Sequence, residues 1–422
     1  MDVPHTPADP PASLPASQTD PATRKDRRTA FAILMLATLC LGLGQTILFA
    51  ILPPLARRLG MADIEVGLVF TLSAFFWVLM SPVWGRRSDQ IGRKPVILLG
   101  VGVFAIALSA LGLALHAGLN AWVPAGALVF LLAGIRAFHG LFSSAAPAAS
   151  QAYIADRTGA QDRTAALAGL GAAFGIGSTL GPGIGGATVQ FGPVVPLFAV
   201  SAIAAAAFVA IAVFLPEQSR PKQRTARGAL KMTDARVRHV LIYGVVSGAL
   251  MVIPIQLTGF YLLDVLALDE TTASQYLGVV FMVNSLAALF GQLVIIGRFR
   301  PSPRLLLIIA PPVLMIGHLI IAVGNDFGTI AFGMLINGLG TGMIRPGYNA
   351  AISLQVSPEE QGAAAGLANA AWTTGHIFTP ALAFSLYAIG IRTPFLVAAG
   401  LAVALMVFAV RFIRLSPAEG AD

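Results

Sequence analysis

Residues 177–186, GSTLGPGIGG, contain the spacing G-x-G-x-x-G between Gly181 and Gly186. In dinucleotide-binding enzymes these glycines let the backbone approach a pyrophosphate. A strand precedes them there, a helix follows, and an acidic residue stands about 20 positions on. Here an apolar run surrounds the glycines, and no acidic residue follows before Glu217. The dinucleotide hypothesis therefore fails, and the sequence predicts no cofactor.

The same segment has a second spacing that suits membrane helices. Five glycines stand at intervals of four residues, in two registers: Gly171 and Gly175, then Gly177, Gly181 and Gly185. Small residues at this interval let two helix backbones touch within a bilayer. Pro182 lies among them and removes one helical hydrogen bond, which permits a bend. The segment therefore predicts a close helix contact with a bend beside it.

Composition indicates the environment of these helices. The 422 residues are 56% hydrophobic and only 11% charged, with a mean hydropathy of +0.80. Soluble domains carry roughly a quarter charged residues, so a soluble chain of this length could not cover its surface. These values predict a membrane protein with many spans. Cys40 is the single cysteine, which excludes an intrachain disulfide and a thiolate metal site.

Charged residues delimit the apolar runs, and each span needs about 20 apolar residues. We predict an all-α membrane protein with twelve transmembrane helices, starting near 29, 66, 95, 122, 164, 194, 239, 272, 305, 328, 361 and 393. The expected parts are a disordered tail (1–28), two pseudo-symmetric six-helix bundles (29–216 and 239–414), a polar linker (217–238) and a second tail (415–422).

The distribution of basic residues predicts the orientation. Twenty-two of the 27 Lys and Arg lie in segments on the side of the N-terminus, and three lie in loops on the opposite side. Basic segments stay in the cytoplasm, so both termini and the linker are expected there, with the chain in a bacterial inner membrane. Topology and lipid headgroups thus account for the net charge of +8. Nucleic acid is not an expected partner.

The two predicted bundles resemble each other in sequence. A shift of 198 residues brings matching residues together without a gap: His139-Gly140-Leu141 with Asn337-Gly338-Leu339, Phe174 with Trp372, Gly177 with Gly375, and Pro182 with Pro380. Repeated bundles joined by a cytoplasmic loop are typical of secondary transporters, whose substrates bind between the halves near the midplane. In such a protein the bend at Pro182 is expected to shape the gate between states.

Three motifs resemble those of the major facilitator superfamily. They are the antiporter motif, Gly177-x-x-x-Gly181-Pro182-x-x-Gly185-Gly186; the cytoplasmic loop motif, Gly85-Arg-Arg-Ser-Asp89-Gln-Ile-Gly92-Arg93-Lys94; and the R-x-x-x-G motif, Arg136-Ala-Phe-His-Gly140. AYIADRT (152–158) and SPEEQGAAAG (357–366) are similar to stretches of bacterial tetracycline-type drug:proton antiporters. The resemblance covers roughly 29–414. It implies export of a small molecule, such as a drug, antibiotic or metabolite, in exchange for protons.

The loop motif predicts a latch on the inner side. Asp89 is expected to accept hydrogen bonds from the start of the eleventh helix, where Ser357 and Glu360 have the spacing of a capping box. Arg93 is expected to pair with Asp156 at the inner end of the fourth helix. A latch between the halves forms only when the inner side is closed, so it would favour the outward-open state.

The sequence does not single out one residue as the proton carrier. Drug:proton antiporters commonly have a carboxylate in the first helix, where this chain has Gln45. Arg136 lies mid-helix, where a charge costs at least about 2.5–3.5 kcal/mol. Two roles remain open for it: a brace to Gln45 or to carbonyls, and proton coupling, which the resemblance favours. His139, one turn away, is a candidate carrier that Arg136 would repel when protonated. Asp89 and Asp156 are the alternatives.

The lack of helical acids also bears on the substrate, because a lipophilic cation would find no counter-ion. A neutral, zwitterionic or anionic substrate fits better. Arg345, in the inner half of the tenth helix, either snorkels to the surface or contacts an anionic or chelating group. The expected cavity residues are Gln45, Gln256, Tyr261, Asn284, Asn337, Arg345, Asn349, Trp372 and His376.

We therefore expect a proton-coupled exporter that works as a monomer, with a small-molecule substrate, protons and membrane lipids as its partners. An importer or symporter of a metabolite is the alternative, which the antiporter motif disfavours. An integral membrane enzyme would need clustered metal ligands or an activated nucleophile. The sequence has no H-x-x-x-H, G-x-S-x-G or P-loop, so an enzyme is not expected.

Overall fold

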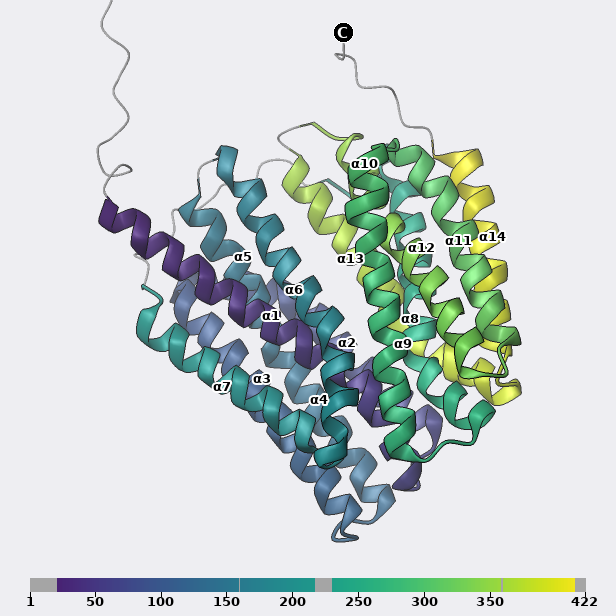
Figure 1. Ribbon diagram of the computed structural model, residues 1–422. Coiled ribbons are helices and arrows are strands. Elements are labelled where there is room, and N and C mark those ends of the chain that lie inside the picture. The colour runs from purple at the N-terminus through teal and green to yellow at the C-terminus, as the bar shows by residue number, and fades with distance from the viewer. Residues whose placement is uncertain (1–20, 159, 217–229, 358–359, 414–422) are drawn as a thin grey trace, which may run out of the picture.

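The computed structural model describes residues 21–158, 160–216, 230–357 and 360–413, and these residues form helices and no strands (Figure 1). The first half contains α1 Pro21–Arg58, α2 Asp63–Ile91, α3 Arg93–Leu119, α4 Ala125–Ser143, α5 Ala145–Arg157, α6 Ala160–Thr188, the 3-10 turn η2 Val189–Phe191 and α7 Val195–Phe214. The expected tail up to residue 20, most of the linker (217–229) and the tail from 414 lie outside the described residues.

The second half repeats the pattern of long helices. It contains α8 Arg238–Leu266, α9 Glu270–Phe290, the π-helical η3 Gly291–Ile296, α10 Gly297–Phe299, α11 Pro303–Val323, α12 Phe327–Ser353, α13 Gln361–Ile389 and α14 Thr393–Phe412. Most helices begin within a few residues of the predicted starts. The exception is α1, which begins at Pro21 rather than near 29. Proline suits the first turn of a helix, and no breaker follows it before the apolar run.

Among the described residues, ten helical segments are long and apolar enough to cross a membrane, so the chain is a multi-pass membrane protein. Two further helices of 29 residues, α6 and α13, are not among the ten. Both are rich in glycine and alanine. The same small residues suit close packing against neighbouring helices.

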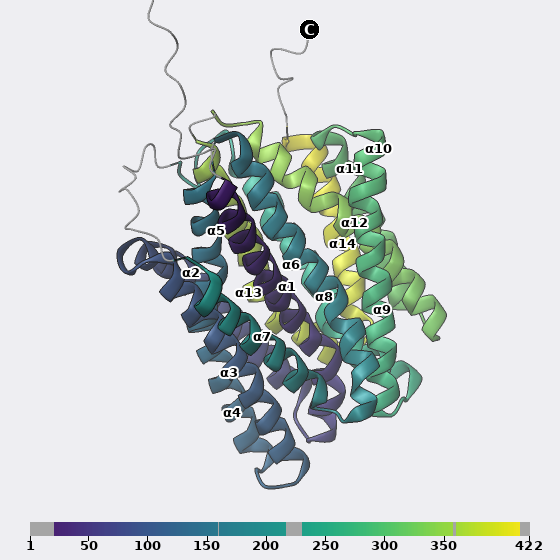
Figure 2. The same cartoon turned by 60° about the vertical axis from the view of Figure 1, so that its left-hand side comes forward.

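The helices pack in two groups, which Figures 1 and 2 show in purple to teal and in green to yellow. In the first group α1 packs on α6, α2 on α4, and α3 on α7. In the second group α8 packs on α13, α9 on α12, and α11 on α14. We call the side at which α2 and α14 end the terminal side, and the opposite side the far side.

Glycines of the antiporter motif let α6 lie directly on α1. A Cβ at Gly177 would overlap the carbonyl oxygen of Leu39, and one at Gly181 would overlap Thr46. A Cβ at Gly185 would lie 2.8 Å from a side-chain carbon of Ile47. The predicted close helix contact is therefore confirmed for these three glycines.

The contact predicted for the second register of glycines is wrong. Nothing lies within 4 Å of a Cβ built at Gly171 or Gly175, and Gly171 is exposed. These two glycines lie on a different face of α6 from Gly177, because neighbouring residues on a helix are rotated by about 100°. Spacing alone does not distinguish the face that meets α1 from the one that does not.

The sequence repeat extends to packing. A Cβ at Gly177 would overlap a carbonyl of α1, and one at the matching Gly375 would overlap the carbonyl of Val245 on α8. Similarly, Gly140 on α4 lies against a carbonyl of α2, and its match Gly338 on α12 lies against a carbonyl of α9. The matched glycines therefore form the same helix contact in each half of the chain.

Contacts between the two groups gather on the far side. Gly186 near the end of α6 meets Gly278 near the start of α9, and a Cβ at Gly186 would lie 3.1 Å from the Gly278 Cα. Gly67 near the start of α2 packs against Phe384 of α13, and Gly259 of α8 packs against Pro53 of α1. The far ends of six helices are thus held together.

Adding one methyl group at Gly177 tests the α1–α6 contact. We expect Gly177→Ala to destabilise the protein by about 1–3 kcal/mol, because the new Cβ would push the α1 backbone away. Gly171→Ala is the matched control on the same helix, and it should be neutral or stabilising by up to about 1 kcal/mol. Unfolding in detergent, followed by fluorescence, measures both; equal effects of the two substitutions would contradict the contact.

Candidate functional site

The loop motif lies between α2 and α3 on the terminal side. Gly92 has a φ of +99°, a backbone conformation that residues with a Cβ rarely adopt. It joins the end of α2 to the start of α3 at Arg93. Arg93 is 6% exposed; it donates to Ser88 at 2.6 Å, and it pairs with Asp89 at 2.5 Å and with Asp156 at 2.9 Å. The expected Arg93–Asp156 pair is present, and it ties α5 to the start of α3.

Two other residues of the motif have different surroundings. Lys94 donates to the carbonyl of Ala212 at 2.8 Å, near the end of α7, where cations suit the helix dipole. Nothing lies within 4 Å of a Cβ built at Gly85. The motif thus holds α2, α3, α5 and α7 of the first group together at their terminal ends.

The expected latch between Asp89 and α13 is not made in this state. Among the described residues Asp89 pairs with Arg93, and its side chain is 55% exposed. Residues 358 and 359, inside the predicted capping box, lie outside the described residues. Glu360 accepts from the Ser357 backbone at 3.1 Å, as a capping box requires, and from Arg236 at 2.9 Å. The Arg236 guanidinium holds the pKa of Glu360 below its usual value.

On the far side, charged residues join the two groups. Arg57 at the end of α1 pairs with Asp264 of α8 and, at 2.7 Å, with Asp63 of α2. Tyr387 of α13 donates to Asp264 at 2.5 Å. We call these four residues the far-side cluster. Arg57 and Asp264 are only 29% and 28% exposed, so the pair is partly shielded from water. A more exposed pair, Arg58 with Glu270 at 3.4 Å, lies beside it.

Sequence reasoning missed this cluster. Arg57 and Arg58 are two of the three basic residues in loops on the side opposite the N-terminus, and the sequence assigned them no partner. One signal was available: both arginines depart from the inward bias of the basic residues. Their partners on α8 and α9 are more than 200 residues away, a pairing that no local pattern predicts.

Arg136 of α4 is 4% exposed. Its guanidinium carbon lies 5.6 Å from the ring centre of Phe70 on α2, within cation–π range. Its Nε has no hydrogen-bond partner among the described residues, and neither has Oε1 of Gln45. The expected brace between Arg136 and Gln45 is therefore not seen at these two atoms.

His139 of α4 is 2% exposed and faces aromatic residues. Its ring stacks on Trp77 of α2 at 5.6 Å and meets Phe104 of α3 at 5.7 Å. Its Nδ1 lies 3.2 Å from the hydroxyl of Ser73, while Nε2 has no partner in the described part of the chain. The imidazole is thus held in place through one nitrogen.

Tyr261, Asn284 and Asn337 have structural contacts rather than the expected cavity positions. Tyr261 is fully buried and donates to the carbonyls of Ala322 and Gly324 at 3.1 Å, which holds the far end of α11. Asn284 donates to the Met334 carbonyl at 2.9 Å and so links α9 to α12.

Asn337 is also buried, at 1% exposed, and its Nδ2 lies 3.4 Å from Nδ1 of His318 on α11. Sequence reasoning missed His318, which is fully buried in the same place. Asn284 lies 3.5 Å from Asn337, so a buried polar chain crosses α9, α12 and α11. All of these contacts lie within the second group.

Three other predicted cavity residues of the second group, Arg345, Trp372 and His376, do meet. The guanidinium carbon of Arg345 lies 5.1 Å from the ring centre of Trp372, across α12 and α13. His376 follows one turn on, with Nδ1 3.1 Å from the Trp372 carbonyl. Arg345 and Asn349 are exposed, whereas Trp372 is 3% exposed. Gln256 on α8 is buried, and its Oε1 has no partner among the described residues.

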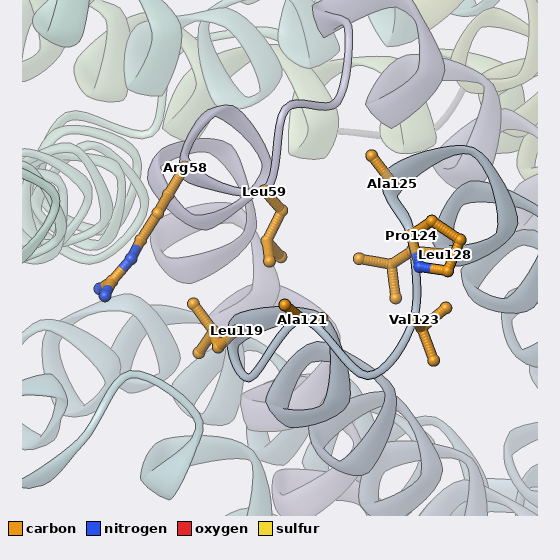
Figure 3. A pocket seen from close by; sticks show the side chains of 9 residues that line it. Arg58, Leu59, Leu119, Ala121, Val123, Pro124, Ala125 and Leu128 are labelled. Carbon is orange, nitrogen blue, oxygen red and sulfur yellow. The ribbon is translucent and has the colours of Figure 1, made fainter.

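A surface pocket of about 420 Å³ lies elsewhere, on the far side of the first group (Figure 3). The ends of α1 and α3 and the start of α4 form it, with Arg58 at its edge. It contains no residue that the sequence predicted for a site, so we do not assign transport to it.

Comparison with known proteins gives a consistent result. Residues 34–310 and 272–422 match the model of the Major Facilitator Superfamily. The chain is 24% identical over 399 residues to Multidrug resistance protein 2 of Bacillus subtilis (strain 168), covering 88% of this chain and 92% of the relative. It is 22% identical over 375 residues to the Quinolone resistance protein NorA of Staphylococcus aureus (strain COL), covering 86% and 91%.

Solved structures share the fold at low identity. The nucleoside transporter NupG matches with a TM-score of 0.73 at 14% identity, over 92% of this chain and 100% of that one. The human organic anion transporter MFSD10 matches with a TM-score of 0.64 at 19% identity, over 91% and 99%. Together with the family match, which spans most of the described helices, these findings show that the chain is a transporter of the Major Facilitator Superfamily and not an enzyme.

Proposed function

We propose that this transporter exports a small molecule, such as a drug, antibiotic or metabolite, across the bacterial inner membrane in exchange for protons. Its α6 and α13 would complete twelve spans in two six-helix bundles, 29–216 and 239–414, with both termini in the cytoplasm. The names of its relatives, for multidrug and quinolone resistance, support export rather than uptake.

The observation that carries the proposal is the asymmetry between the two sides. On the far side, Gly186 meets Gly278 and the Arg57–Asp264 pair joins the groups. On the terminal side, Asp89 pairs within its own group. With the terminal side facing the cytoplasm, this is the arrangement expected of an inward-facing state. Closure of the inner side would then bring Asp89 to α13 and release the far-side contacts.

Helix α2 connects the proposed coupling residues to both gates. Gly67 at its far end meets α13, and Asp89 at its terminal end belongs to the latch. Between them Phe70 lies under Arg136, and Trp77 stacks on His139. A proton on Nε2 of His139 would be repelled by Arg136 one turn away. Movement of either side chain would act directly on α2, and so on both gates.

Proton exchange is tested in inside-out vesicles with an acidic interior, a fluorescent pH probe and a panel of chemically diverse compounds. We expect at least one compound to release protons only when the protein is present. A metabolite importer would instead show uptake in right-side-out vesicles. If verified protein gives no proton release with any compound, export by proton antiport is contradicted.

The same assay tests the coupling residues. Replacing His139 or Arg136 by alanine should reduce proton release to the background of vesicles without the protein, because the proton site or its repelling charge is lost. His116→Ala is the matched control, since His116 is exposed at the far end of α3. Proton release by His139→Ala at the wild-type level would exclude His139 as the carrier.

The far-side cluster is tested by the accessibility of a buried cysteine. Ser274 on α9 is 2% exposed at the contact with Gly186. In a Cys40→Ser background, Ser274→Cys should react slowly with an impermeant maleimide added outside cells. Asp264→Asn should speed this reaction about fivefold, because loss of about 1 kcal/mol from the pair populates the open far side.

Two further variants identify the cause of that change. Glu270→Gln removes the more exposed partner of Arg58 and should leave the labelling rate nearly unchanged. The charge exchange Arg57→Asp with Asp264→Arg should restore slow labelling. An Asp264→Asn rate equal to wild type would show that the cluster does not hold the far side closed.

A further inference from the structure

We infer that Arg345 and Trp372 form a binding site for the carboxylate of an aromatic anion, which makes organic acids a substrate class of this transporter. The inference rests on the proposed export function and names a ligand for it. Four observations support it: the depth of the guanidinium, the exposed polar face around it, the absence of a described acidic partner, and a buried donor without an acceptor.

The depth of Arg345 follows from how α12 and α13 are joined. Ser353 at the end of α12 and Gln361 at the start of α13 exchange two hydrogen bonds, of 2.7 and 2.8 Å, so these helix ends are level. Arg345 is eight residues above this level, about 12 Å at 1.5 Å per residue. Trp372 is eleven residues above it, or about 16 Å. The guanidinium thus packs on the ring of a residue whose backbone lies deeper than that of Arg345.

This contact argues against snorkelling, in which a long basic side chain reaches for the nearer surface. Side chains on a helix lean toward its N-terminus, which for α12 is the far side. Tyr348 follows the same geometry: its hydroxyl donates at 2.9 Å to the carbonyl of Ala368, which is also higher above the joined ends than Tyr348 itself. The side chain of Arg345 is thus directed inward, away from the cytoplasmic headgroups.

The exposed face around Arg345 is polar. Asn349, one turn on, is exposed, and so is Asn369 on the adjoining α13. Phe332, an apolar residue of α12 with 54% exposure, lies thirteen residues before Arg345. At about 100° per residue, it lies about 140° around the helix from Arg345 and so on a different face. Exposed arginine and asparagine side chains would be costly against lipid. They indicate the water-accessible face of the helix, on the side from which a solute arrives.

Arg345 lacks an acidic counter-charge in the described part of the chain, where its charge contact is the Trp372 ring at 5.1 Å. The indole Nε1 of Trp372 is buried and has no acceptor among the described residues. A guanidinium binds a carboxylate through parallel hydrogen bonds, and an indole N–H donates to oxygen. The open face of the guanidinium, backed by aromatic rings, suits a planar acid whose ring packs beside Trp372 and His376.

Three probes with the same ring system and different charges test this site: 1-naphthoate, the neutral 1-naphthamide and the cationic 1-naphthylmethylammonium. Binding to the purified full-length protein is measured by equilibrium dialysis without a proton gradient. We expect the order naphthoate, naphthamide, naphthylmethylammonium, from tightest to weakest. Arg345→Gln should weaken naphthoate binding at least about tenfold and leave naphthamide nearly unchanged.

Further variants separate a binding role from a structural one. Arg298→Gln, at the exposed end of α10, is the matched loss of a cation and should not change any of the three affinities. Trp372→Phe keeps an aromatic ring but removes the N–H, so it should weaken naphthoate binding more than naphthamide binding. Each variant is compared at equal thermal stability, which shows that the fold is retained.

The inference is overturned if naphthoate binds no better than naphthamide, or more weakly than about 1 mM, or if Arg345→Gln keeps the preference for the anion. The dialysis result does not depend on transport. Charge-selective binding without proton exchange in vesicles would overturn the proposed export mechanism and leave the site standing. Proton exchange with cations alone would support the mechanism and overturn the site.

Discussion

The close approach of helix backbones is the constraint on which the rest of this structure depends. Lipid is as apolar as a leucine side chain, so burial alone gives helices little reason to associate in a bilayer. Here glycines of one helix lie directly against backbone carbonyl groups of the next. Gly177 of α6 contacts α1 in this way, and Gly375 of α13 contacts α8. The same device, with Gly186 and Gly278, joins the two groups on the far side. A glycine contact is flat and carries no interlocking side chains. It therefore suits both a permanent contact within a group and a reversible contact between groups.

The positions of the charged residues follow the free-energy cost of burying a charge. At the helix ends, where water is near, they pair across helices: Arg93 with Asp89 and Asp156 on one side, and Arg57 with Asp264 on the other. In the proposed transport cycle, pairs within a group would persist, whereas pairs between groups would break. Arg93 is 6% exposed and is held by three partners, while the Arg57–Asp264 pair is over a quarter exposed. Partial exposure keeps the desolvation cost of an ion pair low, and it also makes the pair easier to separate.

Polar residues in the membrane interior fall into two classes, which the sequence does not distinguish. Tyr261 donates to the carbonyls of Ala322 and Gly324, and Asn337 lies between Asn284 and His318, so both residues contact neighbouring helices. Arg345, Trp372 and His139 keep polar atoms or faces without a described partner. A single tyrosine or asparagine in an apolar run is equally consistent with a side chain that is hydrogen-bonded between helices and with one that lines a cavity. The difference depends on which helix face it occupies and on what lies opposite.

The sequence by itself determined the class of protein and the positions of its helices. Apolar run length, the inward bias of arginine and lysine, and the 198-residue repeat are local or one-dimensional properties, and they lead directly to a membrane transporter. The antiporter glycines and the Arg93–Asp156 pair were also predictable, because short motifs carry them. The tertiary structure alone decided which glycine register meets α1, that Arg57 joins Asp264, and that Arg345 lies over the Trp372 ring. Each of these depends on helix rotation or on the relative height of two helices. Such quantities arise from contacts between segments tens to hundreds of residues apart, so no local pattern in the chain contains them.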